Sequence, residues 1–226
     1  MKTITLITLF VGALAFITNA YASVSANGSV SSDYLWRGDS LSGGDAVVQG
    51  GLDFDGGNFY AGVWVSTLGN GPTLPGEEVD LYVGTDIAGF DLGVIKYEIN
   101  STEFTEIYAG YSIAGFDLYY AQDEEESDNT YMSVSYGFDI TEGITGTLTY
   151  GEWSDEAVVA GLGSGDFLQL DIAYGDMTLT ILDSDERPDV DLAASYSLAF
   201  VMNAKAPTNN VINVIVFILF YNCLFV

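Results

Sequence analysis

Carboxylates are the most abundant groups in this sequence that could do chemistry. The 226 residues include 32 Asp and Glu against 5 Lys and Arg, with no His, so the formal net charge is −27. Hard cations such as Ca²⁺ and Mg²⁺ prefer clustered carboxylates. The densest run lacks the Asp-x-Asp-x-Asp-Gly spacing of a dedicated loop, so we expect no tightly bound cofactor and only loose Ca²⁺ or Mg²⁺ binding by Asp123, Glu124, Glu125, Glu126 and Asp128.

The composition excludes several classes of function. The absence of His removes Ser-His and Cys-His catalysis and the commonest zinc ligand. Carboxylate pairs such as Asp183 and Asp185 suit glycosidase chemistry, but such pairs arise by chance at this composition, and we expect no enzyme. The single cysteine, Cys223, excludes an intrachain disulfide framework. So few bases cannot neutralise phosphates, which excludes a nucleic-acid partner.

The first 22 residues have the pattern of an export signal. Lys2 precedes an almost wholly apolar run from Ile4 to Ile17, and Ala20-Tyr21-Ala22 forms a small-x-small cleavage site. We therefore expect residues 1–22 to be removed and the mature chain to begin at Ser23.

Residues 23–200 alternate between apolar and polar side chains with period two, the pattern of strands with one apolar and one polar face. Leu81 and Val83, for example, alternate with Asp80 and Tyr82. A packed core could not accept the charges of the polar face without partners. The pattern therefore predicts a wet interior lined by Asp33, Arg37, Asp53, Glu78, Asp80, Asp86, Glu106, Asp171 and Asp191.

The connections between these segments alternate between short and long. An internal repeat supports this spacing, because Tyr82-Val83-Gly84 and the following Ile87–Leu92 recur 26 residues later as Tyr108-Ala109-Gly110 and Ile113–Leu118. The pattern predicts an all-β fold: an antiparallel transmembrane β-barrel of about twelve strands, with short periplasmic turns and longer acidic extracellular loops. The expected long loops are residues 38–45, 68–77, 100–103, 122–129, 152–165 and 183–189.

A soluble secreted β-sandwich or β-barrel would show the same alternation, with the apolar face turned inward. Aromatic residues near the expected strand ends favour the membrane barrel, since such residues form girdles at membrane interfaces. The last expected strand also ends in an aromatic residue, Phe200. The expected girdle residues are Tyr34, Trp36, Tyr60, Trp64, Tyr97, Tyr119, Tyr150 and Trp153.

The segment Ser32–Gly38, SDYLWRG, followed by Ser40 and Ser42, resembles the opening motif of a proteobacterial family of outer-membrane porin-like proteins. That family is labelled Gcw_chp or named after the trimethylamine-oxide respiration operon. Residues 48–54, 59–66, 78–84 and 106–110 are similar to its later blocks, and the likeness spans roughly residues 26–200. The resemblance implies an outer-membrane β-barrel with pore activity and carries no catalytic residues.

The extension 201–226 departs from the family pattern. It contains an apolar run from Val211 to Val226, interrupted by Asn213 and Asn222. This run is shorter than the ~20 residues of a spanning helix. We expect the barrel to end at Phe200 and the extension to be accidental; the alternative is an anchor or assembly segment.

A lumen lined by carboxylates should concentrate cations and exclude anions. We therefore expect a bacterial outer-membrane porin for passive diffusion of small cationic or neutral solutes. The alternatives are a closed outer-membrane barrel with a structural or surface-binding role, and a soluble secreted binding barrel. The expected partners are the outer membrane and its lipopolysaccharide, bridged by divalent cations at the acidic loops. Arg37 is expected to pair with Asp33 or Asp39 at the rim, or to mark a constriction.

The size of any opening depends on how aromatic side chains of the polar face are arranged. Tyr60, Trp64, Tyr82 and Tyr108 share this face with the carboxylates. If they extend across a barrel of this size, they close it.

Overall fold

The computed structural model describes residues 23–69, 76–100, 102–154, 165–185 and 189–202. The expected signal segment and the extension beyond residue 202 lie outside the described residues. No helix in the described part of the chain is long and apolar enough to cross a membrane.

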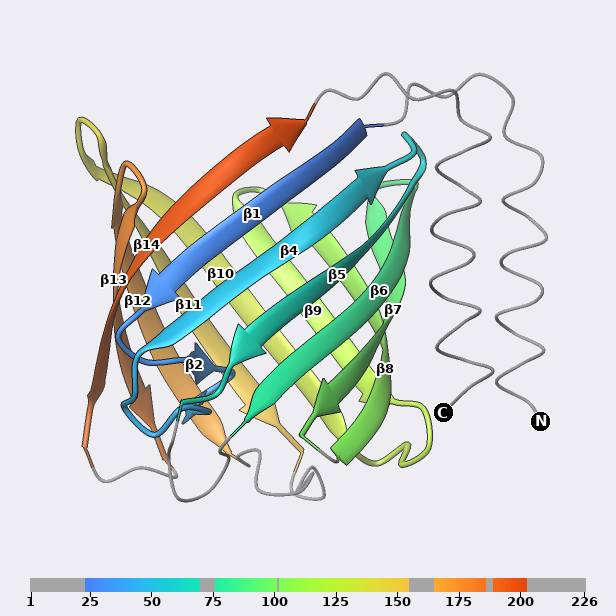
Figure 1. Cartoon of the computed structure of the whole chain (residues 1–226), viewed down its shortest axis with the longest axis horizontal. Helices are drawn as coiled ribbons and strands as arrows, with labels where there is room; N and C mark the ends of the chain where they lie inside the picture. The colour runs from blue at the N-terminus through green and yellow to red at the C-terminus, as the bar shows by residue number, and fades with distance from the viewer. Residues whose placement is uncertain (1–22, 70–75, 101, 155–164, 186–188, 203–226) are drawn as a thin grey trace.

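Twelve antiparallel strands form one closed sheet, in the order β1-β14-β13-β12-β11-β10-β9-β8-β7-β6-β5-β4 (Figure 1). β1 closes the ring because it pairs with both β4 and β14. This confirms the predicted all-β barrel and its strand number. The strands are β1 Ser23–Ser31, β4 Val47–Asp55, β5 Phe59–Thr67, β6 Glu77–Ile87, β7 Phe90–Ile99, β8 Thr102–Ile113, β9 Phe116–Asp123, β10 Thr130–Thr141, β11 Ile144–Trp153, β12 Asp166–Tyr174, β13 Met177–Ser184 and β14 Asp191–Met202.

Short turns join the strands at one end of the barrel. The internal repeat forms two of them, with positive φ at Ala88 (54°) and Gly89 (86°), and again at Ala114 (53°) and Gly115 (85°). Two consecutive residues with positive φ match the right-handed twist of the flanking strands. At the opposite end one expectation is wrong: β7 ends at Ile99 and β8 already begins at Thr102, so the connection between them is shorter than the expected loop 100–103.

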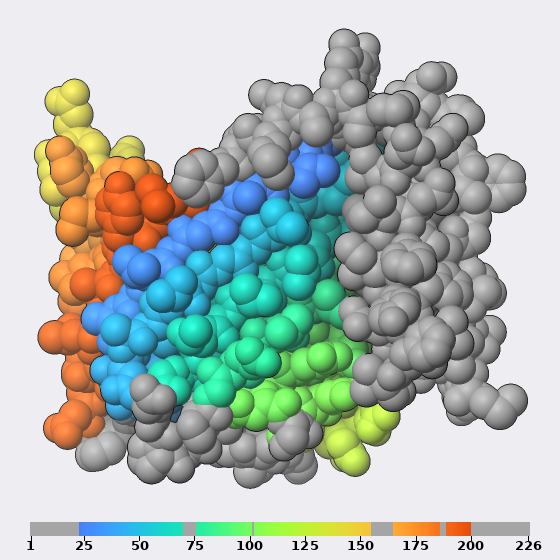
Figure 2. Space-filling view, in the orientation of Figure 1, coloured from blue at the N-terminus to red at the C-terminus, as the bar shows by residue number. Residues whose placement is uncertain are grey.

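The outer face of the barrel is apolar. Figure 2 shows it as a continuous wall of side chains over β1, β4 and β5. Large hydrophobic side chains along these and other strands are exposed there, while their neighbours in sequence point inward. An apolar outer band around a closed antiparallel ring is the defining feature of a transmembrane β-barrel. Examples of exposed side chains are Val48, Leu52, Val65, Ile107, Leu148, Leu168, Leu192 and Leu198.

The expected aromatic girdle is wrong for most of its members. Tyr34, Tyr97 and Trp153 are buried within the ring, whereas Tyr150 is 41% exposed on the outer face. Exposed aromatic residues instead gather beside the short turns, where they would meet one membrane interface. They are Phe90, Phe116, Tyr136, Phe138, Tyr174 and Tyr196.

Candidate functional site in the barrel lumen

The first long connection, between β1 and β4, folds into the barrel. It contains β2 (Leu35–Trp36) and β3 (Asp39–Ser40), which pair with each other and lie inside the ring in Figure 1. Their turn has positive φ at Arg37 (47°) and Gly38 (92°), again the mirror-image form that suits a two-residue hairpin. We call residues 33–42 the inner hairpin.

The base of the inner hairpin is organised around the buried carboxylate of Asp33. Its Oδ1 accepts hydrogen bonds from Ser40 Oγ at 2.6 Å, Ser42 Oγ at 2.7 Å and the backbone N–H of Gly44 at 3.2 Å. Ser42 Oγ in turn accepts the backbone N–H of Tyr34 at 2.9 Å. These bonds compensate the desolvation of the carboxylate and turn the chain inward. The spacing of Asp33, Ser40 and Ser42 in the family motif thus has a structural purpose.

The tip of the inner hairpin is attached to the opposite wall of the barrel. Arg37 donates two hydrogen bonds to Glu106 on β8, at 2.7 and 2.9 Å. Trp153 on β11 donates its indole N–H to the carbonyl of Arg37 at 3.0 Å. Gly38 packs so closely on Phe167 of β12 that a Cβ there would lie 2.8 Å from the ring. The ion pair of Arg37 therefore crosses the lumen, in place of the expected local pair at the rim.

Aromatic rings surround the Arg37 guanidinium. Its Cζ lies 4.2 Å from the ring centre of Tyr131, 4.5 Å from that of Trp36 and 5.2 Å from that of Trp153. Burial by itself would lower the pKa of Arg37, but the attraction of Glu106 and its hydrogen bonds raise that pKa above the ordinary value. Arg37 is therefore a fixed positive charge, stabilised by one carboxylate and by ring faces.

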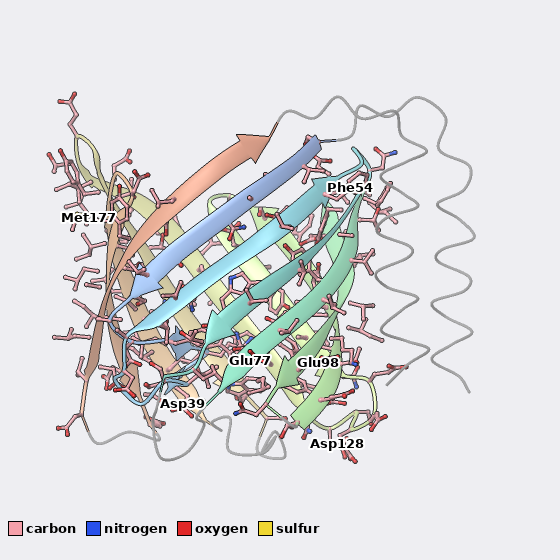
Figure 3. The ribbon with its side chains drawn as sticks, viewed as in Figure 1. Asp39, Phe54, Glu77, Glu98, Asp128 and Met177 are labelled. Atoms are coloured by element: carbon pink, nitrogen blue, oxygen red, sulfur yellow. The ribbon has the colours of Figure 1, made fainter. Side chains whose placement is uncertain are left out.

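Side chains of the inner hairpin and of the wall fill the half of the lumen near the long loops. Figure 3 marks this end by Asp39, Glu77, Glu98 and Asp128, and the opposite end by Phe54 and Met177. Two clusters of buried hydrophobic residues meet at Trp36, which packs against both. They are Tyr34, Leu41, Val47, Leu68, Tyr97 and Ile99, and Tyr108, Ala121, Tyr131, Trp153, Phe167 and Leu182.

Two tyrosines of the inward face, Tyr60 and Tyr108, lie along the wall. Tyr60 pairs with Gly84 across β5 and β6, and a Cβ at Gly84 would overlap the tyrosine ring. Tyr108 covers Gly93 in the same way. Tyr60 donates a hydrogen bond to Asp91, which keeps its ring flat against the neighbouring strands. The glycines of the Tyr-x-Gly segments thus leave space for rings that would otherwise extend across the lumen.

Gly84→Val should destabilise the barrel by about 1–3 kcal/mol, because the new side chain would displace the rings of Tyr60 and Tyr108. Gly137→Val is the matched control, since nothing lies within 4 Å of a Cβ at this strand position. Urea unfolding of both refolded variants, followed by tryptophan fluorescence, measures the difference. Equal losses would contradict the role assigned to Gly84.

The predicted lumen residues differ in their surroundings. The strand acids among them share the inward face, and Arg37 and Asp33 lie on the inner hairpin. Asp53 accepts hydrogen bonds from Asn27 and Tyr82, and Asp171 accepts them from Gln169 and Thr180. Glu78, Asp80 and Glu106 are buried; Asp86 is exposed near a short turn, and Asp191 is half-buried where β14 begins.

The acidic run 123–128 begins at the last residue of β9 and continues into the connection between β9 and β10. Asp123 is buried, and its Oδ1 accepts the backbone N–H groups of Glu125 at 2.8 Å and Glu126 at 3.1 Å, which caps the turn. Glu124, Glu125, Glu126 and Asp128 are exposed. In the described part of the chain, no group of three or more acidic or cysteine side chains is arranged to hold a metal ion.

Sequence reasoning missed the residues that hold the inner hairpin in place. Tyr131 on β10, Trp153 on β11 and Phe167 on β12 contact its tip, yet nothing in their local sequence marks them as contacts of residues 36–38. The motif itself was the one sequence feature that pointed to the inner hairpin, because Ser40 and Ser42 follow Asp33 at the spacing seen in the family.

These features define a class: a transmembrane β-barrel whose lumen holds a hairpin from its own first long connection. The family described as "Bacterial protein of unknown function (Gcw_chp)" matches residues 18–179, and the chain belongs to that family. The resemblance predicted from the motif at Ser32–Gly38 is thereby confirmed.

No curated protein matches the sequence. Distant similarities exist among solved structures. A structure from a study of in-meso crystallization of membrane proteins has a TM-score of 0.47 at 12% identity, covering 80% of this chain and 84% of that one. A triple mutant of the Rhodopseudomonas blastica porin has a TM-score of 0.36 at 11% identity, covering 80% and 99%. Salmonella typhi OmpF in complex with daunomycin has a TM-score of 0.33 at 10% identity, covering 80% and 97%.

Proposed function

We propose that this protein is a porin-type channel of the bacterial outer membrane, through which small cationic or neutral solutes diffuse passively. The observation that carries the proposal is the charge of the inward face. Arg37 and Lys96 are the bases in the described part of the chain, and Lys96 lies on the outer face. The inward face carries carboxylates on most strands, and such a lining favours cations over anions. They are Asp53, Glu78, Asp80, Asp91, Glu106, Asp117, Asp171 and Asp191.

The inner hairpin sets the width of the passage. Side chains of the inner hairpin pack into the half of the lumen near the long loops. The polar half, beside Asp53 and Asp171, lies outside the two hydrophobic clusters to which they belong. Loops that enter a barrel narrow its channel, and so a small conductance is expected. The tight packing around Trp36 also favours a second candidate, a closed outer-membrane barrel that acts through its exposed acidic connection at 124–128.

Single-channel recording of the purified protein in a planar bilayer under a salt gradient tests the proposal. We expect discrete, small conductance steps with a reversal potential that shows preference for cations. Steps with anion preference would contradict the role given to the carboxylates. A heat-modifiable, folded barrel that gives no steps would favour the closed barrel.

A further inference from the structure

Two carboxylates on β6 are buried in the lumen, and three of their four oxygen atoms lack a regular hydrogen bond. Glu78 and Asp80 lie two residues apart on the inward face, and they are 0% and 9% exposed. Neither Glu78 oxygen nor Asp80 Oδ1 receives a hydrogen bond of ordinary length and angle among the described residues. The other buried acids behave differently: Asp33, Glu106 and Asp123 each accept at least two hydrogen bonds. Because an unpaired buried carboxylate is costly, this pair must gain either a partner or protons.

The neighbouring side chains do not neutralise the two carboxylates, although the Tyr34 hydroxyl makes a weak hydrogen-bond interaction with Glu78. The charged groups that act on Asp80 are Glu78, Glu106 and Arg37. Arg37 already gives its two terminal nitrogens to Glu106. With all three carboxyls ionised, a single guanidinium leaves two negative charges uncompensated, which equals the charge of one divalent cation.

Further oxygen atoms surround the two carboxylates. Ser66 is buried and lies directly opposite Glu78 in the pairing of β5 with β6. Tyr34 of the inner hairpin packs on the other side: burial raises its pKa well above the ordinary value, and the charges of Glu78 and Asp80 raise that pKa further. Carboxylate and hydroxyl oxygens are ligands for hard cations.

We propose that Glu78 and Asp80 bind Ca²⁺ in the lumen, between β6 and the inner hairpin. Ca²⁺ accepts irregular oxygen coordination, whereas Mg²⁺ demands near-ideal octahedral geometry. The hydroxyls of Ser66 and Tyr34, together with water, complete the coordination. This site is separate from the exposed acidic connection at 124–128, and it does not require that the barrel conduct ions.

Terbium luminescence tests the proposal directly on the refolded full chain. Tb³⁺ stands in for Ca²⁺ and emits when a nearby aromatic ring transfers excitation energy to it. The ring centres of Tyr34 and Trp64 lie 5.6 Å apart, and Trp64 pairs with Asp80 across β5 and β6. We expect sensitised emission that Ca²⁺ displaces at lower concentration than Mg²⁺.

Isosteric variants assign the emission to a site. Glu78→Gln with Asp80→Asn should weaken Tb³⁺ and Ca²⁺ binding at least about tenfold. Loss of a residue that only orients a metal ligand already lowers metal affinity about 10- to 100-fold, and loss of the ligands themselves should cost no less. Asp53→Asn with Asp171→Asn is the control, since these lumen acids already have hydrogen-bond partners. The control should leave binding unchanged.

Thermal unfolding supplies a second readout that does not depend on Tb³⁺. Ca²⁺ should raise the unfolding temperature of the wild-type chain relative to EDTA, and this shift should vanish in the Glu78→Gln, Asp80→Asn variant. The absence of a Ca²⁺ effect on the unfolding temperature of the wild type would overturn the proposal. Emission lost only on neutralising Glu124, Glu125 and Glu126 would also overturn it.

Discussion

Arg37→Met is expected to lower the free energy of unfolding by about 3–5 kcal/mol, because it leaves a buried carboxylate without its partner. Glu106 is 3% exposed and both its oxygens bond to Arg37. The substitution also removes the positive charge that lies against the rings of Tyr131 and Trp153. Urea unfolding of the refolded protein, followed by tryptophan fluorescence, measures this change.

Lys96→Met is the matched control for this experiment. Lys96 also forms ion pairs, with Glu98 and Glu103, but all three side chains are at least a third exposed. Exposed pairs contribute less than about 1 kcal/mol. The double variant Arg37→Met, Glu106→Met should recover much of the stability, since it removes both buried charges. Equal losses for Arg37→Met and Lys96→Met would contradict a buried pair across the lumen.

Replacing residues 34–41 by a Gly-Ser segment should increase the single-channel conductance several-fold. These residues supply Tyr34, Trp36 and Leu41, which pack with wall residues in the half of the lumen near the long loops. Their removal leaves a twelve-stranded ring whose interior is wider than its side chains can fill. Planar-bilayer recordings of the variant and the wild type at the same salt concentration measure the ratio.

A replacement of residues 124–127 by Gly and Ser is the control, because this exposed connection lies outside the lumen. Its open-state conductance should match that of the wild type. A heat-modifiable hairpin variant whose conductance equals that of the wild type would show that the inner hairpin does not limit the passage.

The sequence predicted the barrel well because its two determinants are local. Alternation assigned inward and outward faces, as for Asp80 and Leu81, whose exposure follows the expected order. Turn residues such as Ala88-Gly89 marked where strands end, and their 26-residue repeat set the hairpin length. Strand number follows from these signals.

The inner hairpin could not be predicted from the same signals. Tyr34 and Trp36 continue the alternation of the first strand, so the pattern indicated a strand that runs on to Trp36. The strand in fact ends at Ser31, and Ser32 Oγ accepts the backbone N–H of Ala194 at 2.9 Å. Arg37 then reaches Glu106, 69 residues further along the chain. Contacts at that separation leave no trace in a period-two pattern.

The aromatic residues were misplaced for a related reason. On β7 both faces carry apolar side chains, since Ile95 and Tyr97 point inward while Leu92 and Val94 point outward. Where the lumen is itself packed with apolar residues, the alternation of hydrophobicity therefore does not indicate which side chains point inward. Only the inner hairpin explains why the wall beside it is aromatic.

Ring closure also constrains how this chain can assemble. β1 needs β14 as its neighbour, and Val24 pairs with Met202 across that seam. The ring of hydrogen bonds between strands is complete only when β14, the last described strand, has paired with β1. A chain truncated before Asp191 would leave β1 and β13 as open sheet edges. Lipid chains cannot form hydrogen bonds with the backbone groups of such edges. The ring can therefore close only when β14 reaches β1.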